Sequence, residues 1–186
     1  MRGERSLPHL VLRAERPGDA TAIAGLHARA FGGEEESQLV EAIRRSDRYV
    51  PGLSIVAEIE GHLVGHLLLS HVDLVDERDA PVARVLILAP MSVAPDWQRH
   101  GIGSALVRTA LRRARARGER LVVLVGHPAF YPRFGFAPAR AQGIAAPIRV
   151  PDDAWMARWL GTGEEHPRGR IVFPPAFTDS LPPPPD

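Results

Sequence analysis

The fold of this chain is decided around residues 93–106, which read VAPDWQRHGIGSAL. The residues before them, 82–93, are almost wholly apolar apart from Arg84, a composition that predicts a central strand covered on both faces. After the turn, apolar residues recur at helical spacing from about Gly101 to Arg117. The sequence therefore predicts a strand, a glycine-containing turn and a helix in direct succession.

The turn between this strand and this helix has the properties of an anion-binding site. Backbone N–H groups from about Arg99 to Ser104 stand at a helix start, where they lack intrahelical acceptors and where the helix dipole adds positive potential. Gly101 and Gly103 carry no side chain, so an anion can approach the backbone closely. A phosphate or pyrophosphate is the expected ligand, with Arg99 and His100 as further donors.

A G-x-G turn is a weak signal by itself, because many strand–helix connections use glycines only for packing. Two nucleotide-binding motifs can be excluded. The P-loop requires a lysine, and this chain contains none. The dinucleotide pattern G-x-G-x-x-G is incomplete, because Leu106 follows where the third glycine would stand. At this point the ligand can be any molecule that carries phosphate.

Further strands and helices are predicted on both sides of this unit. Pro90 cannot donate a ladder hydrogen bond, so we expect a bulge or splay in the central strand. The other expected elements are a strand at 10–13, helices at 19–30 (capped by Asp19) and 34–45, a hairpin of strands 53–59 and 62–72, strands at 121–125, 148–150 and 170–173, and an amphipathic segment at 155–160. This order predicts a single α/β (α+β) domain with a mixed central β-sheet flanked by helices, spanning residues 10–178. Residues 1–9 are expected to be an N-terminal extension and residues 179–186 a proline-rich disordered tail.

Composition excludes several classes of chemistry. The chain has 186 residues, no cysteine and no lysine, so disulfides, thiolate nucleophiles and a catalytic lysine are ruled out. The net charge of +1 gives no reason to expect nucleic acid or a membrane as partner. The eight histidines show no metal-ligand spacing, so we predict no metal. Without a membrane-spanning run or a secretory stretch, the expected location is cytoplasmic.

Two motifs together resemble a known family. The stretch from Val93 to Leu106 resembles the acetyl-CoA signature of the GNAT superfamily, and YPRFGF at 131–136 resembles its late Tyr-x-x-x-Gly-Phe element. They lie on either side of one helix and one strand, as in that family. The resemblance covers about residues 10–140 and is strongest to the YhbS-like branch of predicted acetyltransferases.

The resemblance implies acetyl-CoA as cosubstrate and assigns residues to it. In the family, amides of the signature turn hold the CoA pyrophosphate, the end of the preceding strand pairs with the pantetheine arm, and the tyrosine acts as general acid toward the leaving thiolate. The matching cofactor-binding positions are Met91, Ser92, Val93, Gln98, Arg99, His100, Gly101, Ile102, Gly103, Ser104 and Tyr131. Arg108 is the arginine of the helix that we expect nearest to phosphate.

The general base is less well defined. Many family members use a carboxylate on the strand before the turn, but residues 85–93 contain none. The candidates are His66, His71, His127 and Glu58. A water chain, or an amine that arrives already neutral, would also serve.

Three functions follow from the resemblance. The first is an N-acetyltransferase that moves an acetyl group from acetyl-CoA to a primary amine of a small molecule, amino acid or peptide by direct attack. The alternative is a non-catalytic CoA-binding sensor or docking module, suggested by the missing strand carboxylate. A weaker alternative is acetylation of a protein or of aminoacyl-tRNA. The late strands could also form the surface of a homodimer.

Overall fold

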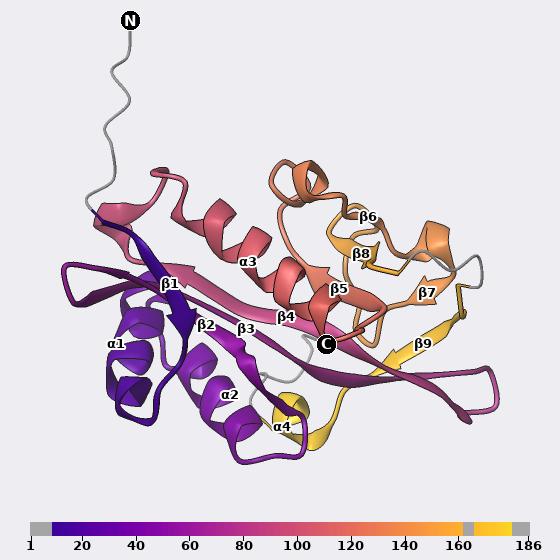
Figure 1. The fold of residues 1–186 in the computed structure, drawn as a ribbon. Helices are drawn as coiled ribbons and strands as arrows, with labels where there is room; N and C mark the ends of the chain where they lie inside the picture. The colour runs from indigo at the N-terminus through magenta and orange to yellow at the C-terminus, as the bar shows by residue number, and fades with distance from the viewer. Residues whose placement is uncertain (1–8, 162–165, 180–186) are drawn as a thin grey trace, which may run out of the picture.

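A mixed sheet forms the centre of the molecule. The structure, a computed structural model, describes residues 9–161 and 166–179, and within them nine strands make one sheet with helices on both of its faces (Figure 1). This arrangement confirms the predicted α/β (α+β) fold. The predicted N-terminal extension and proline-rich tail lie outside the described residues, except for His9 and Asp179.

The strands follow the order β1-β2-β3-β4-β5-β8-β6, and β9 pairs with both β3 and β7. Most neighbouring strands are antiparallel, whereas β4 and β5 are parallel, as are β7 and β9. Parallel neighbours need a crossover connection, which α3 (Ile102–Ala116) supplies between β4 and β5. The bounds are β1 Val11–Ala14, β2 Tyr49–Ile59, β3 His62–Val75, β4 Pro81–Val93, β5 Leu121–Val125, β6 Ala137–Pro138, β7 Ile144–Ala145, β8 Trp155–Trp159 and β9 Gly169–Val172.

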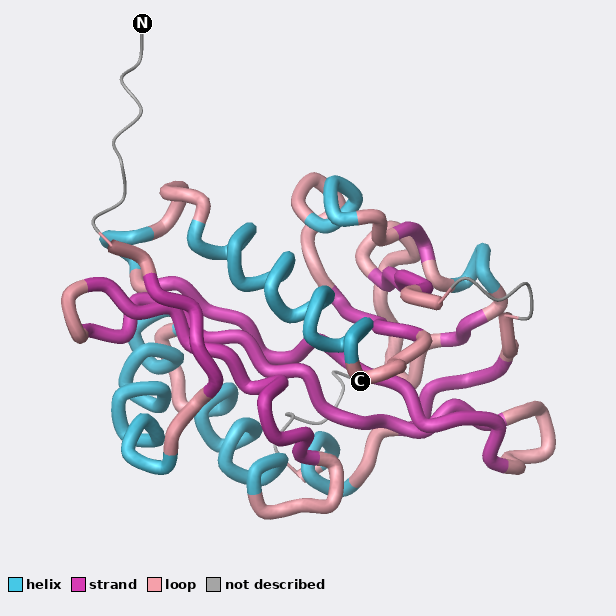
Figure 2. Tube along the Cα trace, viewed as in Figure 1, coloured by secondary structure: helices cyan, strands magenta, loops and turns pink. Residues whose placement is uncertain are grey.

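The helices divide between the two faces of the sheet. Helices α1 (Ala20–Phe31), α2 (Glu35–Arg44) and α4 (Pro175–Thr178) lie on one face, and α3 lies on the other (Figures 1 and 2). Each face has its own apolar core. Among the helices of the described residues, none has the length and apolar character needed to cross a membrane.

Alternation along the strands explains the two cores. On β3, Leu67 and Leu69 pack toward α3, while Leu68 and Val72 pack toward α1 and α2. The predicted inward stripe of α3 is buried, with Leu106 fully excluded from solvent. A strand buried on both faces reads as a continuous apolar run, which is why β4 and β5 were recognisable from the sequence.

Two local predictions were wrong, the strand at 148–150 and the Asp19 cap, and the segment at 155–160, predicted only as amphipathic, forms a strand. Residues 148–150 form no strand, and Ile148 is exposed. The amphipathic segment at 155–160 is the strand β8, whose Trp155 is buried and donates from Nε1 to Ile144 O at 2.9 Å. Asp19 stands before α1 but its carboxylate makes no cap hydrogen bond to that helix, because it is held by Arg13 at 2.6 Å.

Candidate active site

The turn before α3 presents unpaired backbone amides. Arg99 has a φ of +62° and Gly101 a φ of +85°, left-handed conformations of the kind that form anion-binding concavities. No side chain of the described residues caps the start of α3. The first helical hydrogen bond is Ala105 N to Gly101 O at 3.0 Å, so the N–H groups of residues 102–104 have no helical acceptor. The geometry therefore agrees with an anion site at this turn.

Side chains of the turn hold it in shape. Gln98 Nε2 donates to Val93 O at 3.2 Å, and His100 Nδ1 donates to Gln98 O at 2.8 Å. Ile102 is buried in the core, whereas Arg99 and His100 are exposed. The turn is thus anchored at both ends, and its exposed face carries the amides and the two basic side chains.

Strands β4 and β5 separate at the end of the sheet next to this turn. They pair only at Leu86–Val122 and Ile87–Val123, so in the described chain β4 has no β5 partner from Leu88 onward. The β3–β4 register shifts by one residue around Pro90, which confirms the predicted irregularity. The last residues of β4 therefore have no hydrogen-bonded neighbour on the β5 side, and we call this unpaired side of β4 the gap.

Only some backbone groups of β4 face this gap. The Ala94 N–H donates to Val64 O at 2.9 Å, which fixes the alternation of hydrogen-bonded pairs along β3 and β4. By that alternation the backbone of Ser92 bonds to β3, while the backbone groups of Met91 and Val93 point into the gap. An extended ligand could pair with those two residues as an added strand would.

Tyr131 lies close to the same gap in a buried aromatic cluster. Its ring makes edge contacts with Phe130 and Phe136, at centroid distances of 4.9 and 5.8 Å. The ring also lies directly over Gly126, where an added Cβ would be only 2.2 Å from Tyr131 Cε2. Burial raises the pKa of Tyr131 to about 12, and the hydroxyl makes no side-chain hydrogen bond within the described residues. The phenol therefore holds its proton through the neutral range.

The three elements meet at Gly103. A Cβ built on Gly103 would lie 3.6 Å from Phe130 Cζ and 3.8 Å from both Met91 Cε and Val93 Cγ2. The start of α3, the end of β4 and the aromatic segment next to Tyr131 therefore border one common space. The sequence placed these motifs far apart, and the fold brings them together.

Two arginines flank this space. The Arg133 guanidinium stacks over Phe130 at 4.3 Å from the ring centroid, and the Arg108 guanidinium lies 5.4 Å from the centroid of Phe134. Both arginines are exposed, so they can meet a phosphate without an added desolvation cost for a buried charge.

Three of the four candidate bases, His71, Glu58 and His127, each have an environment of their own. His71 Nε2 is 3.0 Å from Glu119 Oε1, and Glu58 is paired with Arg13 at 2.8 Å. The His127 side chain is exposed. Within residues 9–161 and 166–179, no group of three or more His, Asp or Glu side chains is placed to hold a metal ion.

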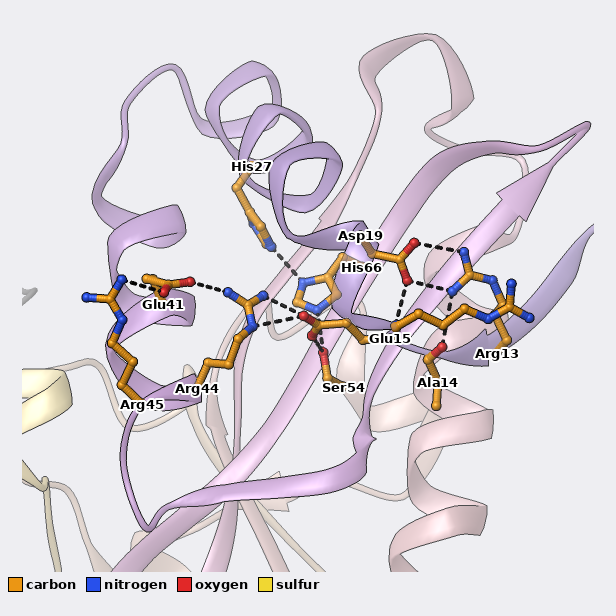
Figure 3. Close-up of polar contacts among 11 residues, drawn as sticks. Arg13, Ala14, Glu15, Asp19, His27, Glu41, Arg44, Arg45, Ser54 and His66 are labelled. Carbon is orange, nitrogen blue, oxygen red and sulfur yellow. Dashed lines mark hydrogen bonds and ion pairs between the residues drawn. The ribbon is translucent and has the colours of Figure 1, made fainter.

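The fourth candidate, His66, belongs to a buried polar chain (Figure 3). His27 Nε2 lies 2.8 Å from His66 Nδ1, and His66 Nε2 lies 2.9 Å from Ser54 Oγ. Ser54 donates in turn to Glu15, whose carboxylate is paired with Arg44 at 2.6 Å. We call the four residues His27, His66, Ser54 and Glu15 the histidine chain.

Sequence reasoning missed His27, Ser54 and Glu15. The signal for His27 was weak: it stands four residues after Ile23 and next to Leu26, on the buried face of α1. Burial lowers the pKa of His27 to about 4 and that of His66 well below its usual value, so both imidazoles are neutral at pH 7.

Comparison with known proteins identifies the family. The model of the acetyltransferase (GNAT) family matches residues 20–136, more than half of the chain. The uncharacterized N-acetyltransferase YjhQ of Escherichia coli K12 is 35% identical over 156 residues, which are 82% of this chain and 85% of that protein. The uncharacterized N-acetyltransferase YhbS of the same strain is 32% identical over 153 residues, 82% of each chain. This chain therefore belongs to the GNAT acetyltransferase family, as its motifs predicted.

Solved structures agree with this assignment. A GNAT family acetyltransferase from Brucella melitensis, in complex with acetyl-CoA, is 30% identical, covers 91% of this chain and 98% of its own, and has a TM-score of 0.74. Escherichia coli YhbS in complex with CoA has a TM-score of 0.81 with 96% of each chain covered; at 24% identity it supports the fold.

Proposed function

We propose that this protein transfers an acetyl group from acetyl-CoA to a primary amine of a small molecule, amino acid or peptide. The observation that carries the proposal is the common space at Gly103, where unpaired helix-start amides, the open edge of β4 and the aromatic segment of Tyr131 meet. Acetyl-CoA offers a matching group to each: a pyrophosphate, an amide-bearing arm and a thioester. The Brucella melitensis relative, which holds acetyl-CoA, supports the choice of ligand.

Each part of the site has a role in this proposal. The amides from Arg99 to Ser104, with Gln98 and His100 bracing the turn, bind the pyrophosphate. Met91 and Val93 pair with the pantetheine arm through their backbones, and Ser92 holds the strand between them against β3. Arg108 and Arg133 add positive charge beside the phosphates.

The reaction is a direct attack. The neutral amine nitrogen forms a bond to the thioester carbonyl carbon, the C–S bond breaks, and the thiolate leaves. Tyr131 Oη gives its proton to the sulfur, and the amine gives up one proton to a base. Because burial keeps the pKa of Tyr131 at about 12, the phenol still carries that proton when the thiolate forms.

Calorimetry with acetyl-CoA tests the proposal. We expect saturable binding, and much weaker binding of acetyl-pantetheine, which lacks the pyrophosphate and is the matched control ligand. Release of free thiol from acetyl-CoA over a panel of primary amines then tests catalysis. Absence of saturable acetyl-CoA binding contradicts the proposal as a whole.

The alternative is a CoA-binding sensor or docking module without catalysis. The observation that favours this alternative is that β4 carries no carboxylate that could serve as the base. This alternative predicts acetyl-CoA binding with no amine-dependent thiol release, whereas labelling of a protein or tRNA by acetyl-CoA would favour the weaker, macromolecular alternative. The cytoplasmic location, the homodimer and the domain limits 10–178 stay predictions of the sequence.

A further inference from the structure

The hydrogen bonds of the histidine chain have a direction that the structure dictates. Glu15 is ion-paired with Arg44 through Oε1, and its Oε2 accepts from Ser54 Oγ. An ionised carboxylate can only accept hydrogen bonds, so the single hydroxyl proton of Ser54 points to Glu15. Ser54 Oγ therefore has no proton left to give to His66.

This direction sets the tautomers of both histidines. His66 Nε2 must carry a proton and donate it to Ser54. Because His66 is neutral in its buried position, its Nδ1 is a bare acceptor, and His27 must donate to it from Nε2. His27 is neutral as well, so its own Nδ1 is a bare lone pair. That atom is buried and has no partner among the described residues.

A second buried polar atom without a hydrogen-bond partner in the described residues lies on the same face of the sheet. Ser92 is paired with His66 across β3 and β4, which places its side chain one strand closer to the open gap. Its hydroxyl is buried and, like His27 Nδ1, unpaired in the described part of the chain. Helix α1, which carries His27, packs over both β3 and β4. Buried polar atoms left without a partner are costly. Ser70 Oγ, farther along β3, is also unpaired in the described residues. His27 Nδ1 and Ser92 Oγ, however, are the two joined to the strand that borders the gap, one through His66 and one directly, and together they indicate a polar ligand group.

We propose that His27 Nδ1 is the base that takes the proton of the attacking amine, and that His66, Ser54 and Glu15 are positioning residues that keep this nitrogen bare. The inference rests on the proposed acetyl transfer. Ser92 Oγ accepts a second hydrogen bond, from the other N–H of the same amine. The acceptor is therefore an amine that enters on the α1 face of the sheet.

The proton balance closes along the chain. The amine proton moves to His27 Nδ1 as the bond between nitrogen and carbonyl carbon forms, and Tyr131 gives a proton to the thiolate. The resulting imidazolium can pass its Nε2 proton to His66 and, through Ser54, to Glu15. Release of that proton to solvent and reprotonation of Tyr131 restore the starting state.

Charged groups of both signs surround the histidine chain. Arg44 opposes a positive charge on His66, while Asp19 favours it, and Glu41 on α2 is paired with Arg44. Tyr49 lies beside Glu15, Arg44 and Ser54. The residues of β4 on this face bring no charge, since Ile87, Ala89 and Ser92 are uncharged. Within the histidine chain itself, Glu15 is the member that carries a negative charge to offset the transferred proton.

Tautomers can be measured without any substrate. Long-range proton–nitrogen NMR on the full chain distinguishes bare from protonated ring nitrogens, and we expect both His27 and His66 to be protonated at Nε2. Glu15→Gln should reverse both. Its amide oxygen would face Arg44 and its NH₂ would donate to Ser54, which would then donate to His66. A wild type with a proton on Nδ1 of His27 overturns the inference whatever the enzyme acetylates.

Kinetics test the base itself. Glutamine at position 27 keeps a donor toward His66 but is not a base, so His27→Gln should lower kcat by about 100-fold at pH 7. The loss should shrink as the pH rises, because hydroxide then replaces the base. Ser54→Ala should lower kcat as well. Ser70→Ala is the control, because Ser70 is an equally buried serine, on β3, whose hydroxyl makes no hydrogen bond to the histidine chain or to another described residue.

The outcomes separate this inference from the proposed function. If the wild-type protein fails to bind acetyl-CoA, the proposed function is contradicted. The tautomers measured by NMR still test the histidine chain in that case. If wild type acetylates amines and His27→Gln keeps both its rate and its pH profile, the chain has no role in proton transfer. An equal loss in Ser70→Ala and Ser54→Ala would likewise reduce it to a structural feature.

Discussion

Acidification should destabilise this protein through the histidine chain, well above the pH at which carboxylates titrate. The perturbation is a change from pH 7 to pH 5, compared between wild type and His27→Gln. Burial lowers the pKa of His27 from 6.5 to about 4. Between those two values the unfolded chain binds more protons than the folded one, so the free energy of unfolding decreases as the pH falls.

The magnitude follows from the two pKa values. Linkage gives a loss of about 2 kcal/mol at pH 5, and about 3 kcal/mol once the pH is below 4, for His27 alone. His66, whose pKa is also lowered by burial, adds a loss in the same direction. Asp19 and Asp73 also have lowered pKa values, but their contribution is present above the usual aspartate value of 3.8 and is lost only as the pH falls below it. The pH range in which the two histidines lower the free energy of unfolding therefore lies above the range in which these two aspartates do.

Urea unfolding followed by circular dichroism at several pH values measures this effect. We expect wild type to lose about 2 kcal/mol more than His27→Gln between pH 7 and pH 5. His62→Gln is the control, because His62 is exposed and does not belong to the histidine chain. Identical pH dependence of wild type and His27→Gln would refute a neutral, buried His27, and with it the tautomer argument.

Three further predictions concern the site. Tyr131→Phe should reduce kcat for amine acetylation by about 100-fold while calorimetry gives an unchanged acetyl-CoA Kd; an equal, small change in both would argue against the acid role. Gly103→Val should weaken acetyl-CoA binding by about 10-fold or more, because its methyl groups fill the space between Met91 and Phe130, whereas Gly103→Ala should bind nearly normally. Gly126→Ala should displace the Tyr131 ring from its position and cut kcat by about 10-fold or more at near-normal Kd; unchanged turnover would mean that the ring position is unimportant.

Elements with a strong local signal were predictable. Helix α3 has its apolar stripe at helical spacing, a left-handed glycine before its first residue and another after its last, so its limits are set locally. The short strands β6 and β7 and the segment at 155–160 have no such signal. A strand of two to five residues exists because a distant partner offers hydrogen bonds, and such partners cannot be read from local pattern.

The candidate site also has a part that the sequence predicts and a part that it does not. The turn proposed to bind an anion was predictable because helix-start amides and glycines are local properties of residues 98–104. The proposed base was not, because the hydrogen bonds that single it out join side chains from separate segments. His66 was considered, but its partners His27, Ser54 and Glu15 lie 39, 12 and 51 positions away, and only their contacts reveal the chain.

By itself, the sequence determined the family, the order of the main elements and the turn that we propose to receive a phosphate. These depend on periodicity, on glycine positions and on short motifs, which act over a few residues. Only the tertiary structure decided that Met91 and Val93, rather than Ser92, turn their backbones to the gap, because pairing with β3 sets that alternation. It also decided that His27 Nδ1 is bare, because burial and the Glu15 carboxylate together orient every proton between them.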